Sequence, residues 1–190
     1  MPRGHFGNRR RFYGLMMFYP RDLSCERRVA SFTFFFRSGS PLSNFYPCTF
    51  EDEHGQQYCC SEQYYQYHKA LLFSDFSMAS RIIHSTDSSF IKRCGRNVKG
   101  YRKNIGRWQK FGARKVMKMG LWLKFTQNSK LAHHLMNTTR VLVEANPYDD
   151  YFGVGLGMYD PAIEDESSWK GRNIQGKLLM ELKDEFEKLT

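Results

Sequence analysis

The sequence predicts an α+β fold that is mainly α-helical, with helices packed around a small β-sheet. Three features favour this class: aromatic residues alternating along 32–36 as in a strand, apolar residues at helical spacing over 107–126, and a short apolar strand at 140–144. A chain of 190 residues with 41% hydrophobic residues can bury one sizeable core. We therefore expect one compact domain.

The elements of the first half follow one another without an internal repeat. Segments 48–50 and 57–59 flank a polar tip and indicate a hairpin. Ser61 is a typical N-cap, because its hydroxyl can accept a free backbone N–H, and its helix should reach about Phe73. A second helix is expected over 75–84.

The second half should contain the longest helix, at 107–126, and a short helix at 129–136. After the strand at 140–144, residues 145–173 are rich in Gly, Asp, Asn and Tyr, so an irregular segment is expected. The last helix should begin near Asn173 and bury one apolar side, formed by Leu178, Leu179, Leu182, Phe186 and Leu189.

The net charge of +10 is concentrated at the N-terminus. Residues 1–30 hold seven arginines against Asp22 and Glu26, so we expect a basic N-terminal tail at 1–30 and a folded domain at 31–190. A solvated arm is the plainer interpretation of the tail. Binding to the phosphate backbone of a nucleic acid is the alternative.

Several protein classes are disfavoured by composition. No apolar run approaches the roughly 20 residues that a membrane helix needs, and no signal peptide opens the chain, so an intracellular protein is expected, cytoplasmic or alternatively nuclear. Five cysteines without a C-x-x-C pair favour free thiols over zinc ligands. Glycines 153, 155 and 157 precede no helix, which argues against a dinucleotide fold. We expect no metal or redox cofactor.

Two segments of the first half could carry chemistry. Asn44 and Tyr46 lie in a polar and aromatic loop, where Asn more often stabilises a turn. Glu62, Gln66 and Lys69 share one helix face at spacings of four and three. That face offers an acid, an amide and a cation, although Glu62 could simply favour the helix dipole and Lys69 could be solvated.

Three further segments complete the set. Arg96 follows a glycine in a basic run, which suits either a phosphate or a solvated surface. Glu144 ends a buried strand and precedes a loop containing Asp149, where carboxylates are good candidates for chemistry. Asn173 opens the last helix, whose free N–H groups could hold an anion, and it is equally a plain N-cap.

In this order and spacing, the segments resemble the NADAR, or YbiA-like, family from about Phe32 to Phe186. Two positions depart from the family pattern, Gln63 in place of His and Phe152 in place of Trp, which bears on substrate preference more than on fold. The matching elements are Leu42-Ser43-Asn44-Phe45-Tyr46, Ser61-Glu62 with Gln66 and Lys69-Ala70, Gly95-Arg96, Trp108, Val116-Met117, Lys124-Phe125 with Gln127-Asn128, Glu144-Ala145 with Asp149, Gly153 with Gly155, and Trp169-x-Gly171-x-Asn173-x-x-Gly176.

The resemblance implies an N-glycosidase that acts on phosphoribosylamino-pyrimidines of riboflavin synthesis or on ADP-ribose attached to a base such as guanine. Breaking a ribosyl C–N bond builds positive charge on the sugar, which a carboxylate can stabilise. We expect Glu62 or Asp149 to be the key carboxylate, with Glu144 as a further catalytic candidate. The expected substrate-binding residues are Lys69 and Arg96 at a phosphate, Asn44 and Asn173 at sugar or base, Gln66 and Gly153 beside them, and Tyr46, Phe152 and Trp169 in the pocket wall.

Three hypotheses stay open. The protein hydrolyses a small ribosylated or ADP-ribosylated metabolite, or it removes ADP-ribose from a base in a nucleic acid, which the basic tail favours weakly. The third is a catalytically inactive module that binds ADP-ribose or a nucleotide; the intact Glu62, Glu144 and Asp149 argue against it.

Overall fold

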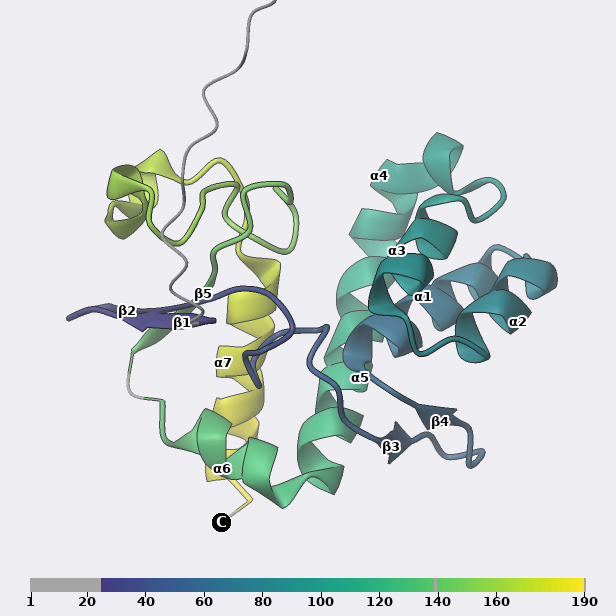
Figure 1. The fold of residues 1–190 in the computed structure, drawn as a ribbon, viewed down its shortest axis with the longest axis horizontal. Helices are drawn as coiled ribbons and strands as arrows, with labels where there is room; N and C mark the ends of the chain where they lie inside the picture. The colour runs from purple at the N-terminus through teal and green to yellow at the C-terminus, as the bar shows by residue number, and fades with distance from the viewer. Residues whose placement is uncertain (1–24, 139, 190) are drawn as a thin grey trace, which may run out of the picture.

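The computed structural model describes residues 25–138 and 140–189, and it confirms a mainly helical α+β fold (Figure 1). The helices are α1 (Ser61–Leu72), α2 (Phe76–Ile83), α3 (Ser88–Arg96), α4 (Ile105–Trp108), α5 (Arg114–Gln127), α6 (Ser129–Met136) and α7 (Ile174–Glu187). Short 3₁₀ turns span Tyr101–Asn104, Pro161–Glu164 and Glu166–Ser168, and a π turn at Gln109–Ala113 joins α4 to α5.

Three strands form the main sheet, in the order β1–β2–β5. β1 (Glu26–Arg28) runs antiparallel to the central strand β2 (Phe32–Phe35), and β5 (Val141–Glu144) runs parallel to β2 on its other side. The register places Phe35 opposite Glu144. The carboxyl ends of β2 and β5 therefore reach the same edge of the sheet, and both strands lead into loops there.

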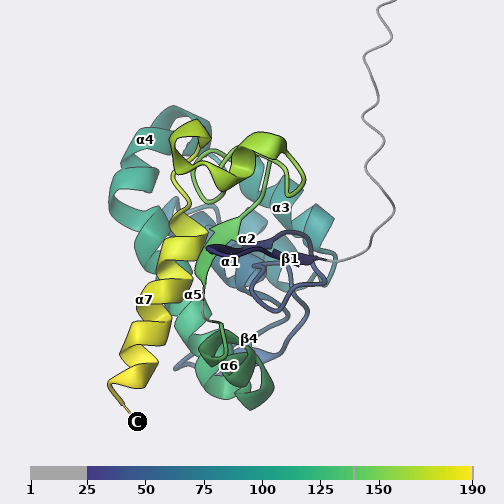
Figure 2. The ribbon, with the colours of Figure 1, turned by 90° about the vertical axis from the view of Figure 1, so that its left-hand side faces the viewer.

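The sheet is covered on both faces, so β2 is buried along its whole length instead of at alternate positions. Phe35 packs in one cluster with Leu142 and the apolar side of α7. Phe34 packs in another with Val143 and side chains of the segment after β5. In Figures 1 and 2 this segment lies above the sheet, and α6 lies below it.

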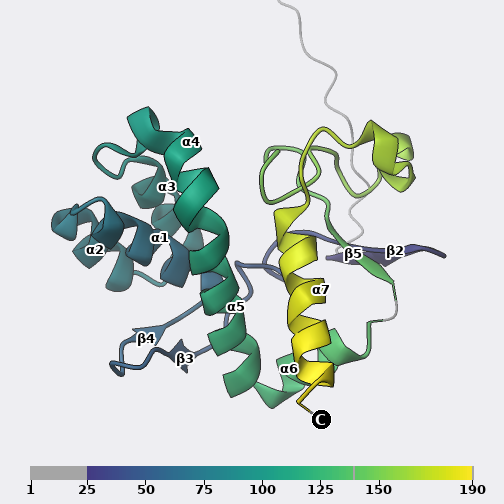
Figure 3. The same ribbon diagram turned by 180° about the vertical axis from the view of Figure 1, so that it is seen from behind.

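Helix α5 connects the two halves of the molecule. It packs against α1 on one side and α7 on the other, and α1 also packs against α2 and α3. Seen from behind, α5 and α7 run beside each other (Figure 3). The arrangement leaves α1 and α3 opposite the loop that follows β5.

Two short elements differ in detail from the sequence expectation. The predicted hairpin is confirmed as β3 (Phe50–Glu51) and β4 (Gln57–Tyr58). The N-cap of α1 is Cys60, not Ser61, which is the first helical residue. The helix therefore starts one residue earlier than expected, because the Cys60 carbonyl already accepts the N–H groups of Gln63 and Tyr64.

Helix α3 was not predicted from the sequence, in which its basic residues formed a run suited either to a phosphate or to a solvated surface. Its N-cap Asp87 accepts the N–H groups of Ser89 and Phe90 through its side chain. The helix predicted at 107–126 is interrupted by the π turn. Within that turn, a side chain at Gly112 would come within 2.4 Å of the Trp108 ring.

Strand β1 lies inside the stretch assigned to the basic tail, so the folded part includes at least residues 26–28 of it. Glu26 accepts hydrogen bonds from Ser40 and pairs with His134, which ties this strand to the rest of the fold. The rest of the predicted tail, residues 1–24, lies outside the described residues. Within the described part of the chain, no helix combines the length and apolar character needed to cross a bilayer.

Candidate active site

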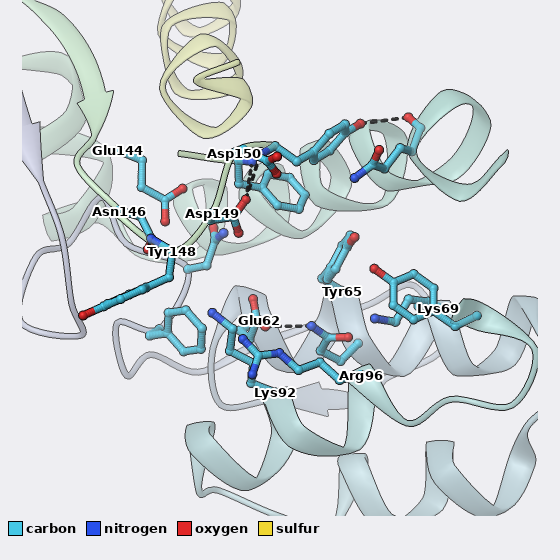
Figure 4. Close-up of a pocket in the computed structure, with 17 residues that line it drawn as sticks. Glu62, Tyr65, Lys69, Lys92, Arg96, Glu144, Asn146, Tyr148, Asp149 and Asp150 are labelled. Carbon is cyan, nitrogen blue, oxygen red and sulfur yellow. Dashed lines mark hydrogen bonds between the residues drawn. The ribbon is translucent and has the colours of Figure 1, made fainter. Parts of the chain in front are cut away.

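A cavity of about 230 Å³ lies between helices α1 and α3 and the loop after β5 (Figure 4). Segments far apart in the sequence build it, and polar side chains dominate its wall. Figure 4 shows Glu62, Lys69, Lys92 and Arg96 on the helical side and Glu144, Asp149 and Asp150 on the loop side. The lining residues are Asn44, Phe45, Glu62, Tyr65, Gln66, Lys69, Lys92, Arg96, Tyr101, Gln109, Glu144, Asn146, Tyr148, Asp149, Asp150, Tyr151 and Phe152.

Helix α1 presents the predicted polar face. Glu62, Gln66 and Lys69 all line the cavity, and the Gln66 Nε2 donates to Glu62 Oε1 at 2.7 Å. This bond fixes the orientation of the Glu62 carboxylate. Burial raises the pKa of Glu62, while the Gln66 hydrogen bond and the ammonium groups of Lys92 and Lys69 oppose that rise.

Helix α3 lies close to α1 because Gly95 has no side chain. A Cβ at this position would lie 1.8 Å from Gln66 Oε1. From the sequence, Gly95 and Arg96 suited either a phosphate or a solvated surface; the structure shows that Gly95 makes room for the Gln66 side chain. The close helix contact brings Lys92 and Arg96 to the cavity wall.

Lys69 is a buried cation, with 2% of its surface exposed. Its Nζ lies 4.0 Å from the centre of the Tyr101 ring and 5.5 Å from that of Tyr65. Burial lowers the pKa of Lys69 to about 8, with Arg96 adding to the shift and Glu62 opposing it. The alternative that Lys69 is merely solvated is therefore wrong.

Glu144 stands at the end of β5, on the opposite wall. Burial, and then the negative charge of Asp149, raise the pKa of Glu144 to about 8, against a hydrogen bond from Asn146. At neutral pH this carboxyl is mainly protonated. Its Oε2 is buried and has no hydrogen-bond partner among the described residues.

Asp149 is oriented by its own backbone loop. Its Oδ1 accepts the N–H groups of Tyr151 at 2.9 Å and Phe152 at 2.8 Å. This turn directs the carboxylate toward the cavity (Figure 4). The Phe152 ring then packs edge-on against Tyr65, with ring centres 5.3 Å apart, and forms an apolar part of the wall.

Asn44 joins the cavity from the loop after β2. Its backbone carbonyl accepts the N–H of Glu62, at 2.9 Å, so this loop and the start of α1 are held together. Its side-chain Oδ1 is buried and, like Glu144 Oε2, has no partner in the described part of the chain. Buried polar atoms without a hydrogen-bond partner are uncommon in proteins, and both of these residues line one cavity. A ligand with hydroxyl groups, which both donate and accept, would satisfy them.

Four expected site residues do not line the cavity. Tyr46 packs near Lys124, and Trp169 packs against Phe32 and donates to the Ile163 carbonyl. Gly153 allows a close backbone approach, since a Cβ there would lie 2.8 Å from Asn146. The fourth is Asn173.

Asn173 acts on the site indirectly. It occupies the N-cap position of α7 with a φ of +50°, as the sequence indicated, but its side chain caps no N–H of that helix and bonds across to β5 instead. Oδ1 accepts the N–H of Glu144 at 3.1 Å, and Nδ2 donates to the Leu142 carbonyl at 2.9 Å. Asn173 thereby holds the end of β5 that carries Glu144.

Several lining residues were not expected as site residues. Lys92 lies in the basic run and Tyr148 in the loop after Glu144, both of which the sequence singled out, and the composition of those segments was their only signal. Tyr65 is held by a hydrogen bond from Trp108 Nε1 at 2.7 Å, and Tyr151 donates to the Gln109 carbonyl at 2.8 Å. The other unexpected lining residues are Phe45, Tyr101, Gln109, Asn146 and Asp150.

Comparison with solved structures supports the fold. The NMR structure of the Escherichia coli protein YbiA superposes on this chain with a TM-score of 0.65 and 26% sequence identity. The alignment covers 88% of this chain and 92% of that one.

Sequence comparison gives further relatives. Protein irg-1 of Caenorhabditis elegans is 33% identical over 175 residues, covering 85% of this chain and 82% of that protein. An N-glycosidase of Acanthamoeba polyphaga mimivirus is 34% identical over 149 residues, covering 76% and 86%. A riboflavin biosynthesis protein of Vibrio vulnificus is 27% identical over 146 residues, covering 77% of this chain and 35% of that protein.

A direct sequence match to a domain family identifies the family of this chain. Residues 34–187 match the NADAR domain, over most of the chain. This confirms the resemblance inferred from the ordered motifs. The chain belongs to the NADAR family, whose enzymes hydrolyse N-glycosyl compounds.

Proposed function

We propose that the protein hydrolyses the bond between C1′ of a ribosyl group and the nitrogen of a base-like amine. The observation that carries this proposal is the pair of opposed walls in the cavity. One wall supplies Glu62 beside the cations of α1 and α3, and the other supplies Glu144 and Asp149. Acids placed on two sides of a sugar are what glycosidic hydrolysis requires.

The two buried glutamates suit different proton-transfer roles. Glu144 is mainly protonated at neutral pH, so it can donate a proton to the departing nitrogen. Glu62, held by Gln66, would stabilise positive charge at C1′ and accept a proton from the attacking water. Asp149 helps to keep Glu144 protonated through its negative charge.

The cations suit the phosphate of the substrate. Arg96 can bond two phosphate oxygens through its planar guanidinium group, and Lys92 lies on the same helix. The charged form of Lys69, which burial disfavours, would be restored by a neighbouring phosphate. The unpartnered Asn44 Oδ1 would accept a hydrogen bond from a ribose hydroxyl.

A second cavity favours a substrate larger than one phosphoribosyl unit. It has a volume of about 350 Å³ and shares six lining residues with the first: Phe45, Lys92, Arg96, Glu144, Asn146 and Tyr148. Tyr148 is 85% exposed, and Arg37 adds another cation. Aromatic rings next to cations suit stacked bases and phosphates. This supports an ADP-ribosylated base over a phosphoribosylamino-pyrimidine.

The proposal is tested by measuring released base from ADP-ribosyl-guanine and from phosphoribosylamino-pyrimidines. We expect release from at least one substrate, and loss of that release in Glu62→Gln. Binding of ADP-ribose without release of base from any of them would contradict the proposal and indicate a binding module.

A polymer substrate is a separate possibility, favoured by the basic residues of 1–24. A chain lacking those residues keeps β1 intact and serves as the test. For an ADP-ribosylated nucleic acid the deletion should raise KM and flatten the salt dependence, because fewer phosphate contacts are made. For a free nucleotide KM should not change.

A further inference from the structure

Two adjacent cysteines lie at the start of helix α1, outside the cavity. Cys59 follows β4 and Cys60 is the N-cap of α1. Their sulfur atoms lie 4.0 Å apart and share a hydrogen bond. Cys59 is partly exposed and Cys60 is buried, with 2% of its surface accessible.

The two thiols differ in reactivity. The hydrogen bond between the two sulfur atoms lowers the pKa of Cys59 to about 7, although burial opposes this. The same bond and burial raise the pKa of Cys60. Cys59 is therefore substantially thiolate at neutral pH, and it is the more accessible sulfur. A partly exposed thiolate beside a second thiol is typical of a pair in which one cysteine reacts and the other resolves.

We propose that Cys59 and Cys60 form an oxidative modification site, at which a peroxide converts the two thiols to a disulfide between neighbouring residues. The Cys59 sulfur attacks the peroxide O–O bond, becomes a sulfenic acid and releases water. The Cys60 sulfur then attacks the Cys59 sulfur and expels its oxygen as a second water. Hydrogen peroxide is reduced to two waters, and the two thiols lose two protons and two electrons.

The disulfide should be readily reversible. Adjacent Cα atoms are about 3.8 Å apart across a trans peptide, shorter than the roughly 4.4–6.8 Å usual for disulfides. A bridge forced into that spacing is strained, and strained bridges are more easily reduced. A dithiol reductant should therefore restore the two thiols.

Forming the disulfide between Cys59 and Cys60 would change the geometry of the active site. The Cys60 carbonyl accepts the N–H groups of Gln63 and Tyr64, which begin α1. Two residues after Cys60, the Glu62 N–H donates to the Asn44 carbonyl. Cys59 N–H also donates to Gln63 Oε1 at 2.7 Å. Closing the bridge rotates the peptide between the two cysteines, so it must disturb these bonds and shift Glu62.

The first test measures the thiol chemistry and needs no substrate. The full chain is treated with hydrogen peroxide, free thiols are alkylated, and the peptide containing both cysteines is analysed by mass. We expect that peptide to lose two hydrogen atoms, to resist alkylation at both sulfurs, and to recover after reduction. Oxidised Cys59 beside an alkylated Cys60, or Cys59 joined to Cys48, would overturn the proposal.

Matched variants identify the pair. Cys60→Ser keeps a good N-cap, so it should fold and accumulate sulfenic acid at Cys59 instead of a disulfide. Cys48→Ser removes the neighbouring thiol whose backbone pairs with Cys59, and it should form the disulfide as the native chain does. A disulfide in Cys60→Ser, or none in Cys48→Ser, would contradict the assignment.

The expected effect of the disulfide on the active site depends on the proposed function only when turnover is what is measured. Oxidation should lower turnover by at least about tenfold, because small displacements of a catalytic group are costly, and Cys60→Ser should resist this loss. Hydrogen exchange of the first α1 amides should rise on oxidation whether or not the chain hydrolyses the substrates offered. A disulfide that leaves both exchange and turnover unchanged would overturn the coupling to Glu62.

Discussion

The charged side chains between α5 and α7 differ from those in the cavity in how they are satisfied. Arg114 pairs with Glu181, and Lys118 pairs with Glu185 at 2.6 Å, all with side chains 37–40% exposed. In the cavity, Glu62, Glu144 and Lys69 are at most 9% exposed. None of these three forms an ion pair within 4.0 Å among the described residues.

This difference separates charges that serve packing from charges that serve chemistry. An exposed pair costs little and contributes little to stability. A buried charge without an ion partner is costly, and it persists where a function requires it. The opposite pKa shifts of Glu144 and Lys69, each to about 8, are the signature of that cost.

The largest expected effect follows from removing a cavity carboxylate. Glu62→Gln and Asp149→Asn should keep the fold, because each replacement preserves shape and hydrogen-bonding capacity. We expect at least one of them to lower kcat by roughly 10²–10⁴-fold, as for a missing general acid or base. Normal turnover by both variants, measured as released base, would remove the proposed mechanism.

Glu144→Gln should lose activity and, at high pH, gain stability. A carboxyl whose pKa rises from 4.5 to about 8 on folding loses stabilising free energy as pH rises through that range, because the native state retains a proton that the unfolded state releases. The variant should therefore gain roughly 1–3 kcal/mol in free energy of unfolding at pH 9. Below pH 4.5 the gain should vanish. Urea unfolding at both pH values gives the comparison, and an equal gain at both would contradict the assigned burial cost.

The pH dependence of turnover tests whether the buried charges of the cavity take part in the reaction. Glu144 acts in its protonated form and Lys69 in its charged form, and both forms are lost as pH rises above about 8. Turnover should then fall by about tenfold per pH unit for each group that is essential. Rates that stay constant from pH 7 to pH 9.5 would exclude both roles.

The smallest effect is expected between α5 and α7. Lys118→Met or Glu185→Gln should change the free energy of unfolding by about 0.2–1 kcal/mol. Turnover should stay at the native level, because neither residue lines the cavity. A loss of turnover comparable to that of Glu62→Gln would show that the distinction between the two regions is false.

Much of the site could be predicted where regular spacing along a helix or strand fixes the direction in which each side chain points. Glu62, Gln66 and Lys69 share one face because helical geometry places residues four and seven apart together. Glu144 was found because a strand end at a sheet edge leads into a loop, and that loop carries Asp149. These positions need only the local conformation to be right.

The remaining differences arise where the direction of a side chain depends on tertiary packing. Tyr46, Trp169 and Asn173 lie in irregular segments, where spacing does not say which way a side chain points. Lys92 reaches the cavity only because Gly95 lets α3 approach Gln66, and no local pattern contains that contact. The same is true of β1, whose place depends on pairing with β2.

A crystal structure of Glu62→Gln with an uncleaved ADP-ribosylated base tests the central claim most directly. We expect the anomeric carbon between residue 62 and the pair Glu144 and Asp149, with the departing nitrogen facing Glu144. Ribose hydroxyls should donate to Asn44, and phosphates should meet Arg96. A ligand whose anomeric carbon lies away from all three acidic positions would contradict it.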